Sequence, residues 1–292
     1  MRVVAAIVAR NLRLFFRDRL NVFFSLLGAI ILFALYTLFL GNLQTEGLEG
    51  RFPAAEPRQV KAFVDSWMFA GIVLITTITT GLGALSVLVD DAQSGRFRDF
   101  LVSPIRRGQI VLGYLIAAVA VALLMSLFVL VLSVLYLGVI DGMWLAPDAL
   151  VRVTGIVVLC CAAFTALSAL IVSGVRTAGA FSALATIVGT VLGFVAGAYI
   201  PVGSLPDSVG NVINALPFGQ AGMLLRRDFT AESLTAMTGG IPEVEEALRP
   251  VYGIDSLVGD WLVPASVAVA ILIVLTIVCT PLAALRLRAR IR

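Results

Sequence analysis

The sequence predicts an all-α integral membrane protein that crosses the bilayer six times as a single transmembrane domain, residues 1–292. Hydrophobic residues make up 60% of the 292 residues and charged residues only 13%, with a mean hydropathy of +1.04. A soluble chain of this length needs far more polar surface. About 20 consecutive apolar residues span a bilayer as a helix, and the stretches that meet this length are residues 21–40, 68–89, 110–139, 151–175, 181–200 and 262–285.

The basic residues predict that both ends of the chain are cytoplasmic. Six spans place the two ends on one side of the membrane, together with the segments that follow the second and fourth spans. Fourteen of the 21 lysines and arginines fall on that side, in short segments beside the ends of spans. Positive charge in such segments marks the cytoplasmic face.

The segment before the first span, residues 2–19, predicts an interfacial helix. In a helix, one arc of about 80° holds Arg2, Arg10, Arg13 and Arg17, and the opposite side holds Val4, Ile7, Val8, Leu12 and Phe15. This separation is typical of a helix that lies in the headgroup plane. A simple positively charged anchor for the first span is the alternative, and the two interpretations are compatible.

Prolines and short apolar patterns predict the structure of the outer segments. Residues 41–65 are polar, and Pro53 and Pro57 argue against a long helix there. In residues 201–261, Asp207 caps a short amphipathic helix that Pro217 ends, and residues 219–225 form a second apolar piece that is too short to span. We expect a short re-entrant helical hairpin, with residues 230–260 in water. An amphipathic loop that rests on the membrane is the alternative.

Small and hydroxyl residues stand out within the apolar spans. Gly189, Gly193 and Gly197 form a doubled G-x-x-x-G in the fifth span, which predicts close helix packing within the subunit or across a dimer. The hydroxyl groups predict a weakly polar pathway for an apolar or amphipathic substrate, lined by Thr76, Thr79, Thr80, Thr186, Thr190 and Tyr199. Threonines also bond back to their own helix, so a local structural role is the alternative.

Several kinds of chemistry are excluded by what the sequence lacks. It contains no histidine, and its one lysine, Lys61, lies outside any G-x-x-x-x-G-K-[ST] phosphate-binding motif. The three cysteines lie inside spans, and we interpret them as small apolar residues. Acidic residues are almost absent from the spans, which argues against proton coupling. We therefore expect no catalytic residue, metal site or cofactor in this chain, so energy must enter from a partner.

The charged segment between the second and third spans, residues 90–109, carries a family resemblance. It reads DDAQSGRFRDFLVSPIRRGQ. This segment resembles the cytoplasmic loop of ABC-2-type permeases, the membrane subunits of type V ABC transporters. Asp90 and Asp91 match the acidic start of the family pattern, whereas Arg96 and Arg98 depart from it. The basic segment 9–24 and the outer segment 214–229 are similar to the family in the same order, so the resemblance covers nearly the whole chain.

The resemblance implies that residues 95–104 are a coupling helix that docks on a separate ABC ATPase, which holds ATP and Mg²⁺. The residues that the resemblance assigns to coupling are Gly95, Arg96, Phe97, Phe100, Leu101, Ser103, Pro104 and Arg106. Apolar anchors and arginine pairing suit such docking. The alternative is that the aromatic residues only hold the loop against the membrane.

The resemblance also implies a function and a set of partners. The chain would be the permease subunit of a bacterial inner-membrane exporter for an antibiotic, a lipid or a peptide, as in multidrug resistance. Its partners would be the ATPase, a second permease copy or paralogue, the lipid bilayer and a small amphipathic substrate, with no nucleic acid. An ATP-independent channel or scaffold is the alternative function.

Overall fold

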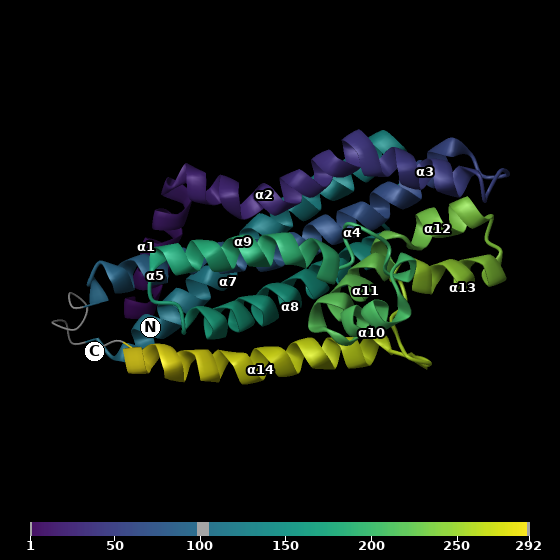
Figure 1. Ribbon diagram of the computed structural model, residues 1–292. Coiled ribbons are helices and arrows are strands. Elements are labelled where there is room, and N and C mark those ends of the chain that lie inside the picture. The colour runs from purple at the N-terminus through teal and green to yellow at the C-terminus, as the bar shows by residue number, and fades with distance from the viewer. Residues whose placement is uncertain (1, 98–104, 291–292) are drawn as a thin grey trace.

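The computed structural model describes residues 2–97 and 105–290, and this part of the chain is almost entirely helical (Figure 1). Its only strands are β1 (Leu257–Val258) and β2 (Trp261–Leu262), which pair antiparallel in a short hairpin. The described residues contain six helices that are long and apolar enough to cross a membrane. The predictions of an all-α fold and of six spans are therefore confirmed.

The six long helices run side by side along the length of the molecule (Figure 1). In chain order they are α2 (Arg19–Leu35) with the π-helical turn η1 (Tyr36–Leu40) and α3 (Gly41–Glu49), α4 (Pro57–Ala84) with α5 (Ser86–Gln93), α7 (Arg107–Tyr136) with the π-helical turn η2 (Leu137–Asp141), α8 (Pro147–Val172), α9 (Ala178–Val195) and α14 (Ala265–Arg290). Both termini lie at the same end of the bundle. We call this the inner end and the opposite end the outer end.

The first polar connection is shorter than the sequence suggests. Residues 41–49 continue the first long helix as α3, so only residues 50–56 form the connection. Pro57 does not break a helix but begins α4, where a proline is tolerated because its missing N–H would have no partner. The N–H of Glu56 donates to the Oε1 of Gln59 at 3.0 Å, which closes the first turn.

The core of the bundle is built around α4. Nearly all side chains of this helix are buried, and α2, α7, α8 and α11 (Pro217–Phe229) pack against it. A helix that is apolar on all sides is stable only where neighbours surround it. Near the outer end, the Nε1 of Trp67 donates to the backbone oxygen of Tyr252 at 2.8 Å, which ties α4 to the segment before the last long helix.

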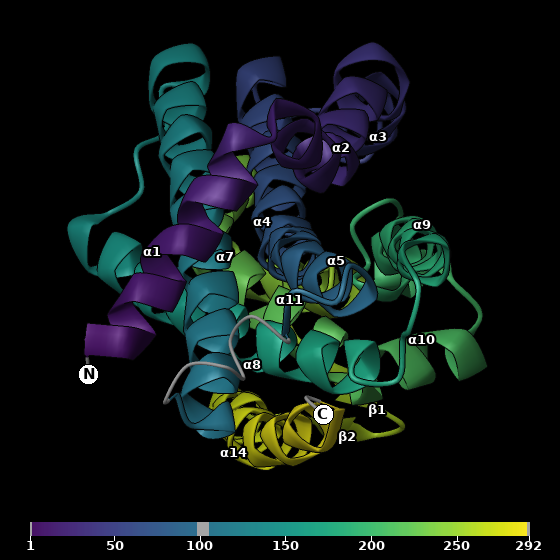
Figure 2. The same cartoon turned by 90° about the vertical axis from the view of Figure 1, so that its left-hand side faces the viewer.

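The N-terminal helix α1 (Arg2–Arg17) packs across the inner end of the bundle (Figure 2). Asp18 ends it and caps α2, since its carboxylate accepts from the N–H groups of Leu20 and Asn21 at 3.1 Å each. The buried face of α1 holds Ile7 and Phe15, and α7 is its main neighbour. The predicted helix is present. Its position in the lipid headgroup plane stays a prediction.

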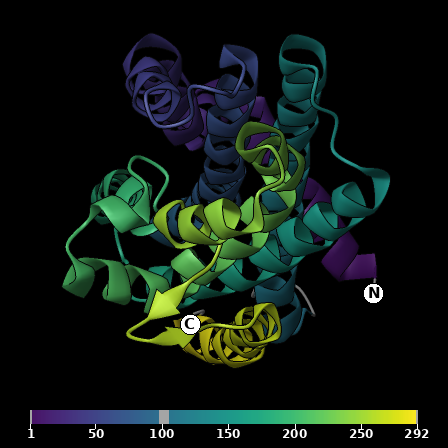
Figure 3. The ribbon, with the colours of Figure 1, turned by 90° about the vertical axis from the view of Figure 1, so that its right-hand side faces the viewer.

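The outer segment is more ordered than the sequence suggests. It consists of η3 (Val202–Ser204), α10 (Asp207–Ala215), α11, α12 (Ala231–Thr238) and α13 (Pro242–Val251), followed by the hairpin of β1 and β2 (Figure 3). Pro217 separates α10 from α11, as expected, but α11 continues through Arg226 to Phe229. Within residues 230–260, α12 and α13 bury Leu234, Met237 and Leu248, and the exposure of this segment to water stays a prediction.

Candidate functional site

A buried carboxylate, Asp91 in α5, organises the inner end of the bundle. Its side chain has no exposed surface. Arg10 of α1 donates to both carboxylate oxygens, from Nη1 to Oδ2 at 2.7 Å and from Nη2 to Oδ1 at 3.1 Å. The hydroxyl of Tyr114 in α7 donates to Oδ2, and the Nη1 of Arg96 lies 3.1 Å from Oδ1. We call these four residues the Asp91 cluster.

The Asp91 cluster stabilises the inner end only while it is complete. An unpaired carboxylate in the protein interior is strongly unfavourable, and removal of one partner from a buried ion pair destabilises a protein by about 3–5 kcal/mol. The hydrogen bond to Asp91 is the main cause that raises the pKa of Arg10 above its ordinary value. The cluster therefore joins α1, α5 and α7 through charged hydrogen bonds.

The loop between α5 and α7 is attached to four helices of the bundle. Its first residues reach α1 and α7 through Asp91, and Phe97 packs edge-on against the ring of Tyr114, with 5.9 Å between ring centroids. The Oε1 of Gln93 accepts from the backbone N–H of Ala178, the first residue of α9, at 2.9 Å. Just after the loop, in the first turn of α7, Gly108 lies against the guanidinium of Arg288 in α14. The residues on both sides of the loop therefore contact α1, α7, α9 and α14.

The structure describes half of the residues that the resemblance assigns to coupling. Gly95 ends the helical turn after α5 with a positive φ of 75°, which glycine adopts without strain. Arg96 is half exposed but pairs with Asp91 inside the chain. Phe97 is half buried, and Arg106 is exposed just before α7. Phe100, Leu101, Ser103 and Pro104 lie outside the described residues.

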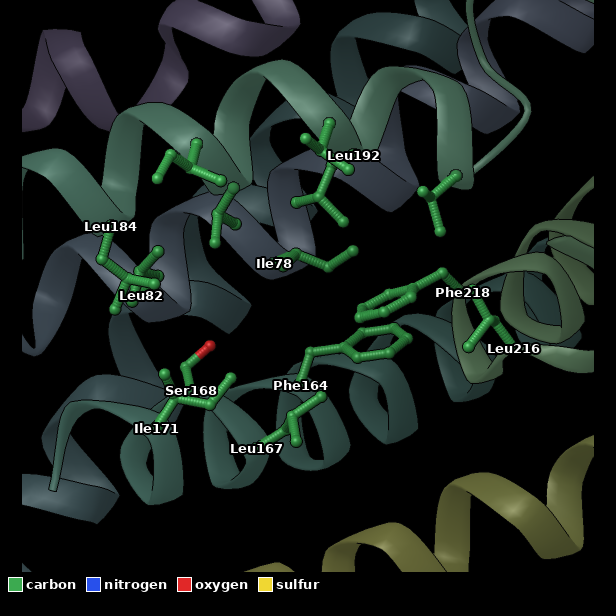
Figure 4. A pocket seen from close by; sticks show the side chains of 14 residues that line it. Ile78, Leu82, Phe164, Leu167, Ser168, Ile171, Leu184, Leu192, Leu216 and Phe218 are labelled. Atoms are coloured by element: carbon green, nitrogen blue, oxygen red, sulfur yellow. The ribbon is translucent and has the colours of Figure 1, made fainter. Parts of the chain in front are cut away.

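An apolar cavity of 270 Å³ lies between α9 and the helices α4 and α8 (Figure 4). We call it the α9 cavity. One wall comes from α9 and the other from α4 and α8, and the lining residues are Ile78, Leu82, Phe164, Leu167, Ser168, Ile171, Leu184, Ile187, Val188, Val191, Leu192, Val195, Leu216 and Phe218. Near the junction of α10 and α11, the rings of Phe164 and Phe218 stack with their centroids 5.1 Å apart.

The lining of the α9 cavity determines what can occupy it. Ser168 is its only polar side chain, and an apolar cavity without several polar partners does not hold ordered water. Pockets that bind small molecules are predominantly apolar and have few polar groups. The cavity therefore suits an apolar ligand or the apolar part of an amphipathic one.

The hydroxyl residues predicted to line a pathway lie elsewhere. Thr76 and Thr80 are buried and donate to backbone oxygens of α4, at 2.8 Å and 2.6 Å. Thr79 donates to the backbone oxygen of Ser25 in α2 at 2.9 Å. Thr186 and Thr190 are exposed and bond back within α9. Among the described residues these threonines contribute nothing to the lining of the α9 cavity, so their contacts favour the local structural role. Their place in a pathway stays a prediction.

The glycines of the fifth span have three different environments. A side chain at Gly189 would meet open space, whereas the ring of Tyr199 occupies the space beside Gly193. Gly197 lies beyond the end of α9, with a φ of 60°. The three glycines therefore do not form one continuous helix face, and the segment around Tyr199 turns back on α9.

Arg10 and Arg226 make buried contacts that the sequence pattern does not predict. Arg10 was grouped with its exposed neighbours, although Asp91 shares a buried face of α5 with Val87 and Leu88. An acidic residue in an apolar face is a signal that a basic partner is nearby. Arg226 lies in the interior of the outer segment, and its partners are backbone oxygens that no side-chain pattern reveals.

The comparison with known families agrees with the arrangement of the helices and the loop. The sequence model of the ABC-2 type transporter family matches residues 2–226. The chain belongs to this family. No curated protein matches the sequence. The ABC-2 family match extends from α1 through the Asp91 cluster and α9 to Arg226, and it identifies a multi-pass transport permease. Membrane proteins of the ABC-2 family are generally not catalytic themselves and typically work with an ABC ATPase.

Proposed function

We propose that this chain is the permease subunit of an ATP-driven exporter, and that a separate ABC ATPase docks on the loop between α5 and α7. The observation that carries the proposal is the Asp91 cluster. It fixes the start of this loop to two other helices of the bundle through charged hydrogen bonds. A loop transmits force to a helix bundle only if it is attached rigidly to the helices.

In the proposed mechanism, the partner ATPase supplies the energy and this chain undergoes the conformational change. ATP and Mg²⁺ bind to the partner ATPase, whose closure pushes on the loop. Because the loop is attached to α1 and α7 through Asp91 and to α9 through Gln93, its displacement tilts these helices together. The bundle then alternates between states that open toward the cytoplasm and toward the outside.

The proposed substrate is a hydrophobic or amphipathic molecule such as an antibiotic, a lipid or a peptide. The α9 cavity supports this class, since it offers apolar contacts and one hydroxyl group. Exposed apolar side chains on α2, η1 and α9, including Phe23, Leu38, Ile187 and Phe194, offer a surface for a second permease copy or paralogue. The proposed location is the bacterial inner membrane, with the inner end of the bundle in the cytoplasm.

Reconstitution tests this function directly. The chain and a candidate ABC ATPase, sought first in the neighbouring gene, are purified together and placed in liposomes with a fluorescent amphipathic substrate. We expect transport that requires ATP and a hydrolysis rate that differs from that of the ATPase alone. Substrate flux without ATP would instead support the ATP-independent channel.

A pair of matched variants tests the docking site. Replacement of Phe97 and Leu101 with aspartate should abolish co-purification of the ATPase, because apolar anchors would become charged. The control is Ile241→Asp, which places an aspartate at an exposed apolar position of the outer segment. Co-purification that survives the loop variant would count against docking at this loop.

A further inference from the structure

Arg226 is a buried cation that holds the outer end of α9. It lies in α11 and is only 3% exposed. Its Nη2 donates to the backbone oxygens of Ala196 and Gly197, at 2.6 Å and 2.8 Å. These oxygens belong to the end of α9, where a helix leaves its last carbonyl groups without partners and carries a partial negative charge. Arg226 therefore caps α9 from another helix.

The surroundings of Arg226 are shaped for its guanidinium group. Glycines surround it, and a Cβ at Gly253 or at Gly222 would lie 2.8 Å or 3.1 Å from its Nη1. The guanidinium carbon lies 5.5 Å from the ring centre of Trp67. Within the part of the chain that the structure describes, no carboxylate pairs with Arg226. Burial lowers the pKa of Arg226 to about 10, so it stays charged at neutral pH and depends on the end of α9 for compensation.

Other contacts fix the same end of α9. A Cβ at Gly71 of α4 would lie 2.8 Å from the Cβ of Ala198, so this glycine leaves a notch for the alanine. The hydroxyl of Tyr36 donates to the backbone oxygen of Tyr199 at 3.2 Å. The outer end of α9 is thus joined to α4, to α11 and to the turn η1 after α2.

The middle of α9 has one exposed face and one face on the α9 cavity. Ile187 is 61% exposed, and the α9 cavity separates the middle of the helix from α4 and α8 (Figure 4). At the inner end, Gln93 accepts from the first N–H of the helix, and Thr177 caps it. The helix α9 therefore forms one wall of the cavity. Its outer end is fixed by the contacts described above, and its inner end is bonded to Gln93, the last residue before the loop.

We propose that Arg226 is the positioning residue about which α9 turns, and that α9 is the movable wall of the α9 cavity. Displacement of the loop would reach the inner end of α9 through Gln93, while Arg226 keeps the outer end in place. The cavity would then widen or narrow from its inner end. This inference rests on the proposed function only for the source of the displacement.

Distance measurements between spin labels test the two attachments separately. The native cysteines are first replaced with serine, and cysteine pairs are introduced for labelling in lipid nanodiscs. The outer pair is Thr190→Cys in α9 with Val151→Cys in α8, and the inner pair is Ser182→Cys in α9 with Leu285→Cys in α14. All four positions are exposed, so the labels leave the core unchanged. Pulsed electron paramagnetic resonance then reports the width of each distance distribution.

The variants are chosen to release one end of α9 at a time. Arg226→Met should broaden the distribution of the outer pair, and Gln93→Ala should broaden that of the inner pair alone. Arg226→Lys keeps the charge but has a shorter reach, so we expect a smaller broadening of the outer pair, and it serves as the test if the methionine variant does not fold. The control is Arg227→Met, which removes the neighbouring arginine and its 2.6 Å ion pair with Asp255. It should leave both distributions unchanged.

The results distinguish this inference from the proposed function. These distances are measured without the ATPase. A broader outer-pair distribution in the Arg226 variants and a broader inner-pair distribution in Gln93→Ala therefore support the two attachments of α9 even if no ATPase binds. Outer distributions that stay as narrow in Arg226→Lys and Arg226→Met as in Arg227→Met would overturn the role of Arg226. With the ATPase bound, addition of ATP should shift the inner pair more than the outer pair. Equal shifts would overturn the turning motion while leaving ATP-driven transport intact.

Discussion

Replacement of Arg10 with methionine should destabilise the inner end of the bundle by removing the main partner of a buried carboxylate. The methionine side chain keeps much of the apolar stem but cannot donate to Asp91, which has no exposed surface. Hydrogen bonds to a charged group contribute about 1.5–3 kcal/mol each, and Arg10 makes two to Asp91. The side chain of Arg10 is 31% exposed, and Tyr114 and Arg96 remain as donors. We therefore expect a net loss of about 2–3 kcal/mol.

Thermal unfolding of the purified protein measures this loss. For a chain of this size, the expected fall in the midpoint temperature is roughly 4–12 °C. The control is Arg13→Met, one turn further along α1, where the arginine is exposed. Asp91→Asn in the Arg10→Met background should restore part of the stability, because a neutral amide is less unfavourable to bury than an unpaired carboxylate. The reasoning fails if Arg10→Met unfolds at the same temperature as Arg13→Met, or if Asp91→Asn makes the double variant worse.

Two further predictions concern the α9 cavity and the glycines that pack against Arg226. Ser168→Trp should fill the cavity and reduce substrate transport while the ATPase still binds. The control Val158→Trp, on the exposed face of the same helix, should leave transport unchanged. Equal transport by both variants would show that the substrate does not use the cavity. Gly259→Ala should lower stability by about 1–2 kcal/mol through its positive φ alone. Gly253→Ala has the same backbone strain and also brings a methyl group to 2.8 Å from Arg226. The Gly253 variant should therefore unfold at a lower midpoint temperature than the Gly259 variant. The opposite order would refute the close contact between Gly253 and Arg226.

Local sequence patterns were sufficient for the spans and for the helix junction in the outer segment. Apolar runs predict spans because the bilayer requires a fixed length of apolar helix whatever the neighbours are. Pro217 predicts the start of a new helix because its ring cannot follow a preceding helical turn. These features depend on residues that are close together in the sequence.

Features that depend on distant partners could not be predicted in this way. The spacing of Gly193 and Gly197 indicated a helix face, but the space beside them is taken by Tyr199 and Arg226. Nothing near Arg226 in the sequence shows that backbone oxygens 29 and 30 residues earlier accept its hydrogen bonds. The pathway hydroxyls had the same weakness, since a threonine that bonds to its own helix has the same sequence pattern as one that faces a ligand.

The bond between Trp67 and Tyr252 has a consequence for how the protein is made. The donor and the acceptor are 185 residues apart, so five of the six long helices are synthesised before the acceptor exists. Until then, the indole N–H at the outer end of α4 has no internal partner, and Phe63, whose ring packs 4.9 Å from that of Tyr252, is uncovered. A chain interrupted between α9 and residue 252 therefore exposes an aromatic and polar surface on its central helix. Completion of the outer segment closes that surface, so a helix that is synthesised early is fully packed only after a much later segment has been made.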